Sequence, residues 1–398
     1  MYRATQAREV IRLLVENNLV MEQEDLDVTD LSGLPAIQQK MLDGKMSKPK
    51  GVALVQADQQ GRSVKFYENA YLGKLIRKAD PDNEQFLEIN CSDGIGIVTL
   101  SRPDALNALS TPLVTQLGDV IREIKESGKI SGETIKALII RGSGRAFVAG
   151  ADVKEFADNT AVNVQVIAGK NIGTFSDIET LPIPVIALVD GFALGGGNEL
   201  SMSTHYCIVT ENAQLGQPEI KLGIIPGYGG LQRLPRLIGP RKATEMSING
   251  ESIDARTAVA IGLADEFAVS ATALLTAVRT AQKMISGEMK VNRRDWDKIA
   301  AQQMPELEAL IQDEQVKALY AVAKPEGEKA SDIAVARSYA AQYVLDAIKV
   351  GYEKGFQAGL ENDALLFGEI AASPSGQEWI KRFINKDPKQ SSFLTLFR

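Results

Sequence analysis

Residues 184–239 read PVIALVDGFALGGGNELSMSTHYCIVTENAQLGQPEIKLGIIPGYGGLQRLPRLIG, and the rest of the chain is organised around them. The stretch opens with an apolar, β-branched run, Pro184–Val189, which predicts a buried strand. Three consecutive glycines follow at 195–197, and a short helix is predicted to begin near Asn198. Glycine lets backbone N–H groups approach a ligand closely, and the first N–H groups of a helix have no partner inside it. The stretch therefore predicts a row of backbone donors that can point at developing negative charge.

Two glutamates accompany these donors. Glu199 stands just inside the predicted helix, and Glu219 follows the run GQP at 216–218. Two carboxylates beside a row of free amides are the parts needed for acid–base chemistry next to an oxyanion. Each glutamate taken alone also has an ordinary structural explanation. Glu199 would be an acid favoured by the helix dipole, and Glu219 a loop residue in an ion pair.

At these residues the sequence resembles the crotonase (enoyl-CoA hydratase/isomerase) superfamily. RAFVAGADVKEF, at Arg145–Phe156, resembles the family's other signature, and PGYGGLQRL, at Pro226–Leu234, resembles a third. All three occur in the family's order and spacing, and the resemblance runs from about Phe86 to about Val269. It implies an α/β fold in which the chain winds into a spiral of strand-strand-helix (ββα) turns.

The resemblance also implies an activity, the hydration of 2-enoyl-CoA thioesters. It assigns Glu199 to orient and deprotonate the water and Glu219 to protonate Cα. The backbone N–H groups of Ala151 and Gly196 would bind the thioester oxygen. Coenzyme A, carried by the substrate, is expected against four residues: Ala149, Ala151, Asp152 and Lys154. No other cofactor and no metal are expected.

Some residues of these motifs have alternative explanations. Asp152 would instead cap a helix that starts at Val153, and Lys154 would be only a solvated charge. The loop 226–230 is expected to shape the backbone behind Glu219 rather than to touch substrate. Asn198 stands where many hydratases of the family carry cysteine, with an effect on the water site or the acyl pocket.

Composition limits the function classes. The chain has 398 residues, with 44 Lys and Arg against 51 Asp and Glu, so its net charge is −7. An acidic chain without a long basic run argues against a nucleic-acid or anionic-membrane partner. No run of eighteen apolar residues is present, so no membrane span is expected. The N-terminus lacks the apolar region of a signal peptide, which favours the cytoplasm.

The cysteines and the single histidine do not suggest a metal site. Cys91 and Cys207 have neither metal-ligand spacing nor a secreted disulfide pattern, and we expect both in the core. A zinc site or a Ser-His-Asp triad would depend on His205, which lies at a predicted helix end. We interpret His205 as structural.

Three regions are predicted: an accessory segment at 1–85, a spiral core at 86–269 and a helical region at 270–398. The first contains a predicted helix at 5–18 and another near 32–44. Val10–Gln56 faintly resembles the end of a medium-chain dehydrogenase or enoyl reductase, but it lacks the G-x-G-x-x-G of a dinucleotide site. The core should open with a hairpin that turns through a three-residue loop, Ser92–Gly94.

The last region should be helical throughout, with breaks at Pro305 and Pro325. Its arrangement resembles the extension of the hydratase half in multifunctional fatty-acid oxidation α-subunits. In those proteins a hydroxyacyl-CoA dehydrogenase follows, so here that activity would be absent or would come from a separate protein. The family resemblance also implies a homo-oligomer, a trimer or hexamer. Helices beyond Ser270 are expected to cover the acyl pocket, because their apolar faces must be buried.

Three rival functions stay open at this stage. A Δ3-Δ2 enoyl-CoA isomerase, or a dual enzyme, would need only the proton-carrying Glu219. A non-catalytic scaffold or RNA-binding relative is opposed by the glutamate pair and the net charge of −7. An oxidoreductase rests only on the faint N-terminal resemblance.

Overall fold

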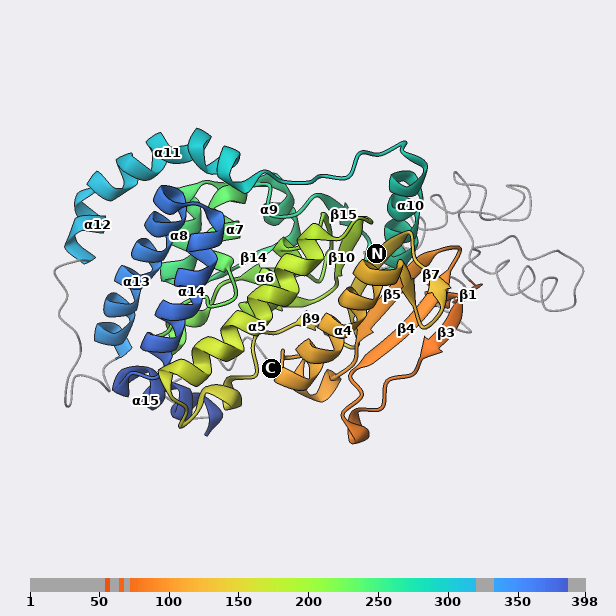
Figure 1. The fold of residues 1–398 in the computed structure, drawn as a ribbon, viewed down its shortest axis with the longest axis horizontal. Coiled ribbons are helices and arrows are strands. Elements are labelled where there is room, and N and C mark those ends of the chain that lie inside the picture. Colours follow the sequence, from red (N-terminus) through yellow and green to blue (C-terminus); the bar gives the residue numbers. More distant parts are fainter. Residues whose placement is uncertain (1–53, 58–63, 68–71, 320–332, 386–398) are drawn as a thin grey trace, which may run out of the picture.

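The computed structural model describes residues 54–57, 64–67, 72–319 and 333–385. The helices predicted at 5–18 and 32–44, and the break predicted at Pro325, lie outside these residues. The first described element is a strand pair, in which β1 (Leu54–Ala57) lies antiparallel to β2 (Val64–Tyr67). The site is built by two larger sheets and the helices around them (Figure 1).

The larger sheet has seven strands among the described residues, in the order β15-β12-β10-β8-β5-β4-β3. Strands β5, β8, β10, β12 and β15 pair in parallel, whereas β4 and β3 add antiparallel strands at one end. Their bounds are β3 Lys74–Arg77, β4 Leu87–Ser92, β5 Ile95–Leu100, β8 Ala137–Gly142, β10 Val185–Val189, β12 Tyr206–Thr210 and β15 Glu266–Ala268.

Within the described part of the chain the smaller sheet has four strands, in the order β14-β13-β11-β9. They are β9 Ala146–Val148, β11 Phe192–Leu194, β13 Gln214–Gly216 and β14 Ser252–Asp254. Three times in succession the chain gives one strand to the larger sheet and the next to the smaller: β8 then β9, β10 then β11, β12 then β13. This repetition confirms the predicted spiral of strand-strand-helix turns.

The hairpin between β4 and β5 differs from the prediction. Ser92 pairs with Ile95, so the loop is the two residues Asp93 and Gly94 rather than three. Both have positive φ, +50° and +81°, as a type I′ turn requires. The predicted three-residue loop is wrong because Ser92 still belongs to the strand.

The larger sheet also begins earlier in the chain than the predicted core boundary at Phe86. Strand β3, Lys74–Arg77, pairs antiparallel with β4, with Lys74 opposite Cys91. Gly73 makes this approach possible, because a Cβ there would lie 2.3 Å from the Cys91 carbonyl oxygen. Residues Lys74–Arg77 therefore belong to the sheet, although they precede the predicted boundary.

The helices that follow the strands of the spiral form one wall of the core. In α4 (Thr111–Ser127) the apolar residues recur every three or four positions, and all six of them are buried: Leu113, Val114, Leu117, Val120, Ile121 and Ile124. The helix packs against α5, Ala161–Thr180. The remaining helices of this part are α6 Gly196–Met202, α7 Gly230–Ile238, α8 Pro240–Asn249 and α9 Ala255–Ala260.

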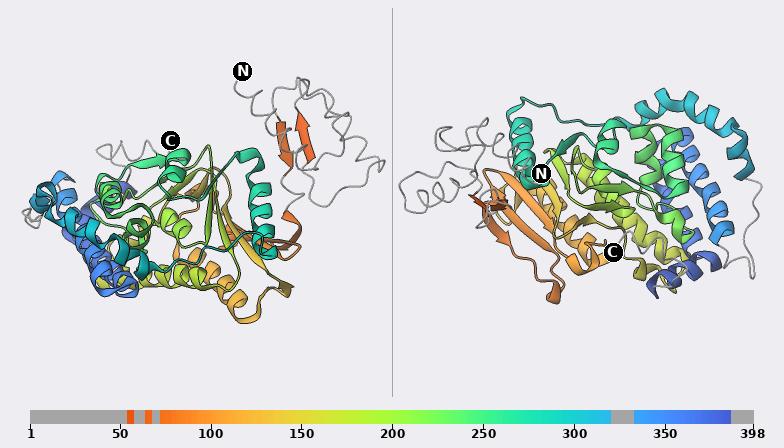
Figure 2. Two further views of the ribbon diagram at one scale, coloured as in Figure 1. Left: turned by 90° about the horizontal axis from the view of Figure 1, so that it is seen from above. Right: turned by 180° about the vertical axis from the view of Figure 1, so that it is seen from behind.

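Helix α10 (Ala273–Ser286) leaves the spiral and covers the outer face of the larger sheet. Its buried face, which includes Leu274 and Val278, packs with isoleucines of β5, β8 and β10. Figure 2 shows α10 on one side of the sheets and the other C-terminal helices on the opposite side. The two faces of the larger sheet are thus covered by different parts of the chain.

The remaining C-terminal helices pack on the spiral helices, with α14 against α5 and α13 against α7 and α8. Their bounds are α11 Trp296–Gln312, α12 Glu314–Leu319, α13 Ile333–Lys354, α14 Phe356–Ala371 and α15 Pro374–Ile384. The predicted break at Pro305 is wrong, since Pro305 lies inside α11. No helix in the described ranges is both long and apolar enough to cross a membrane.

Candidate active site

A cavity of about 410 Å³ lies between the glycine turn after β11 and the C-terminal helices. All seven residues that the sequence singles out for the site line it: Ala149, Ala151, Asp152, Lys154, Gly196, Glu199 and Glu219. They come from three connections that each follow a strand of the smaller sheet, β9, β11 and β13. The spiral therefore brings its three chemical segments to one cavity.

The first backbone donor is Gly196, at the start of α6. The N–H of Gly195 donates to the Gly216 carbonyl, and the first bond of the helix runs from the Glu199 N–H to the Gly195 carbonyl, both at 2.9 Å. The N–H of Gly196 lies between them and has no acceptor among the described residues. It is available to an oxygen atom in the cavity.

The second donor is Ala151. Leu109 forms an isolated parallel bridge with this residue, in which the Leu109 N–H donates to the Gly150 carbonyl and the Asp152 N–H donates to the Leu109 carbonyl. A parallel bridge of this kind uses the groups that flank Ala151 and leaves its own N–H on the other side. Like Gly196, Ala151 thus offers a backbone N–H to the cavity that it lines.

The glycines are required by close packing. A Cβ on Gly197 would lie 2.0 Å from the Val148 carbonyl oxygen, so α6 can approach β9 only without a side chain there. A Cβ on Gly196 would lie 3.0 Å from the ring of Tyr228 and 3.1 Å from Leu109. Gly195 has φ +52°, which glycine adopts readily.

Glu199 is buried in the first turn of α6. Its Oε1 accepts hydrogen bonds from the backbone N–H of Tyr228, at 2.8 Å, and of Gly230, at 2.7 Å. Burial raises the pKa of Glu199 to about 7, while these two hydrogen bonds and the Arg233 charge act in the opposite direction. Glu199 can therefore gain or lose a proton near neutral pH.

These contacts correct the prediction for the loop 226–230. The sequence predicts that this loop shapes the backbone behind Glu219 and does not touch substrate. Instead its backbone holds Glu199, and Gly227 and Tyr228 line the cavity.

Glu219 is the first residue of a 3₁₀ turn, η6 (Glu219–Leu222). Burial raises its pKa well above the ordinary value, and the charge of Glu199 raises it further. Its Oε1 lies against Gly195, where a Cβ would be 2.7 Å away, and its Oε2 has no hydrogen-bond partner in the described part of the chain. A pair of such carboxyls is most stable near neutral pH when at least one of the two is protonated.

Asp152 performs the capping role that the sequence left open. Its Oδ1 accepts from the Lys154 N–H at 3.3 Å at the start of η5, Val153–Phe156. Its Oδ2 pairs with Arg102 at 2.7 Å, and Arg102 also donates to the Ala108 carbonyl at 3.1 Å. Arg102 lines the cavity too. The sequence did not identify it, because its only distinguishing feature is its position shortly after β5.

Asn198 does not line the cavity. It is fully buried, and its backbone carbonyl accepts from the Ser201 hydroxyl at 2.8 Å. Its Nδ2 has no partner among the described residues. Its side chain therefore lies in the core and not at the acyl pocket, which was one of the two places where the sequence suggested that Asn198 acts.

The C-terminal helices do reach the cavity, as predicted. Phe367 of α14 lines it, and so do Phe383 and Ile384 at the end of α15. The ring of Phe367 packs edge-on against Phe156, with centroids 5.1 Å apart. The apolar wall is thus completed by residues far from the motifs in sequence.

The sequence also missed a buried ion pair behind Glu199. Arg233, which has no exposed surface, donates from Nε and Nη2 to the carboxylate of Glu179, both at 2.8 Å. Its Nη1 donates to the Tyr228 carbonyl at 3.1 Å. Tyr228, whose N–H binds Glu199, is therefore itself held by Arg233 through its carbonyl.

His205 has a structural role, as interpreted from the sequence. Its Nδ1 accepts from the Val185 N–H at 3.0 Å, and its Nε2 lies 3.1 Å from the Glu179 carbonyl oxygen. Burial lowers its pKa to about 4, and the charge of Arg293 lowers it further. Cys91 and Cys207 are buried and free. The described residues contain no cluster of three His, Cys, Asp or Glu that could hold a metal ion.

The Enoyl-CoA hydratase/isomerase family has a sequence model that matches residues 90–331, more than half of this chain. Among solved structures, an enoyl-CoA hydratase from Mycobacterium avium subsp. paratuberculosis K-10 is 21% identical, with a TM-score of 0.52, over 74% of this chain and 98% of that one. This likeness shows a shared fold.

Two further solved structures are similar over much of their length. An enoyl-CoA hydratase from Bacillus anthracis is 27% identical, with a TM-score of 0.47, over 76% of this chain and 97% of its own. DspI from Pseudomonas aeruginosa is 26% identical, with a TM-score of 0.47, over 59% of this chain and 91% of its own.

Proposed function

The chain belongs to the enoyl-CoA hydratase/isomerase family, and we propose that it adds water across the 2,3 double bond of 2-enoyl-CoA thioesters to give 3-hydroxyacyl-CoA. The observation that carries the proposal is the glutamate pair. Glu199 and Glu219 are both buried carboxyls with raised pKa values, and they line one cavity with the backbone donors at Ala151 and Gly196. The reaction would make the protein a hydro-lyase.

The proposed reaction uses each of these groups. Ionised Glu199 orients a water molecule and accepts its proton as the oxygen bonds to C3. The electrons of the double bond move toward the thioester oxygen, where the N–H groups of Ala151 and Gly196 stabilise the negative charge. Protonated Glu219 then gives its proton to C2, so that one water molecule is added overall.

The two N–H donors would contribute the largest electrostatic share. One donor of this kind contributes roughly 3–4 kcal/mol of transition-state stabilisation in comparable oxyanion sites. The hydrogen bonds from Tyr228 and Gly230 occupy Oε1 of Glu199, so Oε2 is the oxygen proposed to face the water.

Coenzyme A is proposed to bind at Ala149, Ala151, Asp152 and Lys154, at the end of the cavity beside η5. Backbone groups would do most of this, because the Asp152 carboxylate already caps η5 and pairs with Arg102. The substrate itself brings coenzyme A, so no further cofactor and no metal are part of the proposed reaction.

A Δ3-Δ2 isomerase, alone or as a second activity, is the alternative that the same site supports. Moving a proton between C4 and C2 needs one carboxyl that can both give and take it. Glu219, with its raised pKa and an oxygen that has no partner in the described residues, suits that role. A non-catalytic scaffold of the same fold is the candidate from another class, and two buried carboxyls at one cavity argue against it.

Three further proposals concern the setting, and the last two of them rest on the family resemblance. We propose a cytoplasmic location, a homo-oligomer that is a trimer or hexamer, and a separate hydroxyacyl-CoA dehydrogenase that oxidises the product. The layout shared with fatty-acid oxidation α-subunits stays a prediction. Sedimentation velocity on the full chain tests the oligomer.

The direct test is the loss of absorbance of the conjugated thioester when crotonyl-CoA is mixed with the protein. Hydration is expected, with 3-hydroxybutyryl-CoA identified by chromatography. The matched control is the Glu219→Gln protein, which keeps the shape of the side chain but cannot deliver the proton. An unchanged spectrum with the unmodified protein, or equal rates for both proteins, would overturn the proposal.

A further inference from the structure

Tyr228 occupies a position next to the proposed oxyanion donor. A Cβ on Gly196 would lie 3.0 Å from Cδ2 of the Tyr228 ring. The ring packs edge-on against Phe175 and Phe367, with centroids 6.3 Å and 6.1 Å away. Tyr228 also lines the cavity, so its side chain adjoins the space left for an acyl chain.

The hydroxyl of Tyr228 differs from those of the other tyrosines. It is buried, and it has no hydrogen-bond partner among the described residues. Each of the other tyrosines whose side chains are described has a partner: Tyr206 bonds Glu266, Tyr339 and Tyr343 bond each other, and Tyr352 bonds Gln303.

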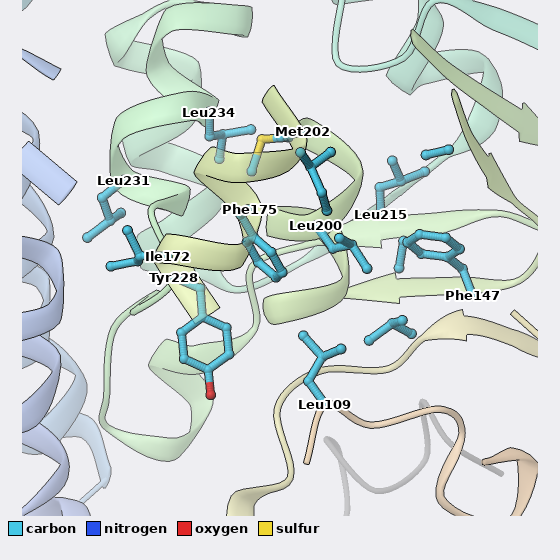
Figure 3. Close-up of a cluster of buried hydrophobic side chains, with 14 of the residues drawn as sticks. Leu109, Phe147, Ile172, Phe175, Leu200, Met202, Leu215, Tyr228, Leu231 and Leu234 are labelled. Atoms are coloured by element: carbon cyan, nitrogen blue, oxygen red, sulfur yellow. The ribbon is translucent and has the colours of Figure 1, made fainter. Parts of the chain in front are cut away.

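Figure 3 shows where this hydroxyl points. The Tyr228 ring lies at the edge of the apolar cluster that includes Phe175 and Leu231, and its oxygen is directed away from those side chains. A buried hydroxyl without a partner is unfavourable, whereas one that gains a partner on ligand binding adds specificity. The geometry therefore fits a donor kept for the substrate.

The charges around Tyr228 limit the kind of group it can meet. Burial raises its pKa well above the ordinary value, and the carboxylates of Glu199, Glu155, Glu219 and Asp152 raise it further. The phenol thus stays protonated and acts as a donor. The same negative surroundings disfavour a second anion beside it, so the matching acceptor is a neutral oxygen.

We propose that Tyr228 selects acyl chains that carry a neutral oxygen, a hydroxyl or a carbonyl, beyond the 2,3 double bond. Atoms C1 to C3 are engaged by the backbone donors and the two glutamates in the proposed hydration, on which this inference rests. The rest of the chain is what remains to meet the Tyr228 hydroxyl. The preferred substrates are therefore oxygenated enoyl thioesters rather than plain hydrocarbon ones.

The test compares kcat/KM for three thioesters: crotonyl-CoA, 4-hydroxycrotonyl-CoA and glutaconyl-CoA. We expect the hydroxylated substrate to exceed crotonyl-CoA by about tenfold or more, and the carboxylated one to be the poorest. Tyr228→Phe should lower the ratio of the first two by about tenfold, because only the donor is lost. The matched control is Tyr339→Phe, whose hydroxyl bonds Tyr343 away from the cavity and whose loss should leave the ratio as it is.

A second measurement does not depend on turnover. Calorimetry with butyryl-CoA and 4-hydroxybutyryl-CoA should show tighter binding of the hydroxylated thioester, and Tyr228→Phe should remove the difference. Equal affinities together with equal kcat/KM values in the unmodified protein would overturn the inference, as would a preference that survives in Tyr228→Phe. If no enoyl thioester is hydrated but the binding preference is present, the proposed function fails while the role of Tyr228 stands.

Discussion

Arg233 and Glu179 form a two-pronged ion pair, in which Nε and Nη2 of the guanidinium each lie 2.8 Å from one oxygen of the carboxylate. Arg233 has no exposed surface and the Glu179 side chain is 15% exposed, so the pair is largely buried. Nη1 of Arg233 donates to the Tyr228 carbonyl, and the N–H of Tyr228 donates to Glu199. A structural ion pair is thereby linked to a proposed catalytic carboxylate through one residue of backbone.

Arg233→Met should destabilise the protein and shift its activity profile. Removing one member of a buried ion pair leaves the other charge unpaired, which costs about 3–5 kcal/mol. The Arg233 charge also lowers the pKa of Glu199, so its loss should move the acid limb of kcat/KM to higher pH. Urea unfolding and a pH profile with crotonyl-CoA measure the two effects.

The control for this variant is Arg241→Met. Arg241 pairs with Asp313 on an exposed surface at 3.3 Å, and such a pair contributes about 1 kcal/mol or less. An Arg233 variant that is destabilised without a shifted profile would show that the pair is purely structural.

Replacing each of the two glutamates in turn should distinguish hydration from double-bond migration. Glu199→Gln should lower hydration by about 10²- to 10⁴-fold, the range of general acid–base catalysis, while sparing double-bond migration. Glu219→Gln should remove both reactions, since each needs its proton. Spectrophotometric assays with 2-enoyl and 3-enoyl thioesters give the two rates.

Glu314→Gln, a change at an exposed residue of α12, is the neutral control for these substitutions. Full hydration by either active-site variant would contradict the assignment of that glutamate.

The hydration rate should rise with pH through about 7. Glu199 acts as a base only when it is ionised, and burial places its pKa at about 7. Glu219 must keep its proton, so the rate should fall again above the raised pKa of that carboxyl. A bell-shaped profile of kcat/KM with crotonyl-CoA is therefore expected, and a flat profile between pH 5 and 8, roughly the window of such titrations, would contradict it.

Acid should destabilise the fold through His205. Its pKa is about 4 when folded and near 6.5 when unfolded, so the unfolded chain takes up the proton first as pH falls. The stability that the neutral ring contributes is complete above pH 6.5 and is lost between 6.5 and 4, a change of about 3 kcal/mol.

His205 is the only histidine of the chain. His205→Gln should therefore remove the histidine contribution to the pH dependence of the free energy of unfolding, measured by urea unfolding at several pH values. The same variant at pH 8 gives the reference for its other effects on stability. An unchanged slope would mean that the ring takes up its proton at the same pH in the folded and the unfolded chain.

Two N-terminal truncations should differ in melting temperature, because only one of them removes β3. Removing residues 1–71 keeps β3, and we expect unchanged turnover of crotonyl-CoA. Removing residues 1–79 deletes β3 and exposes the edge of β4, which should lower the melting temperature by about 3 °C or more. Equal melting temperatures for the two proteins would show that β3 contributes nothing to the sheet's stability.

The sequence predicted those parts of the site that are encoded locally. The run from β10 to Glu199 contains the expected strand, glycine turn and helix in order, because these follow from apolar runs, φ > 0 and helix starts. Strand β11 within this run was not predicted, and α6 begins at Gly196 rather than near Asn198. The chemistry of Glu199 and Glu219 came from the family resemblance rather than from such patterns.

The features that were missed depend on contacts between distant residues. Arg233 meets Glu179 across 54 positions, and no pattern near either residue announces the other. Likewise, Phe383 reaches the cavity only because α14 and α15 fold back over η5. The hairpin loop was overestimated for the opposite reason, since Ser92 is a turn-forming residue that the sheet keeps in register.

The cavity takes its walls from residues as far apart as Arg102 and Ile384. During synthesis on the ribosome, the strands and glycine turn are complete long before α14 and α15 emerge. A growing chain that already contains both glutamates therefore still has an open, unfinished pocket, with Phe367 and Phe383 not yet made. The wall of the cavity is complete only when the last of these helices has left the exit tunnel.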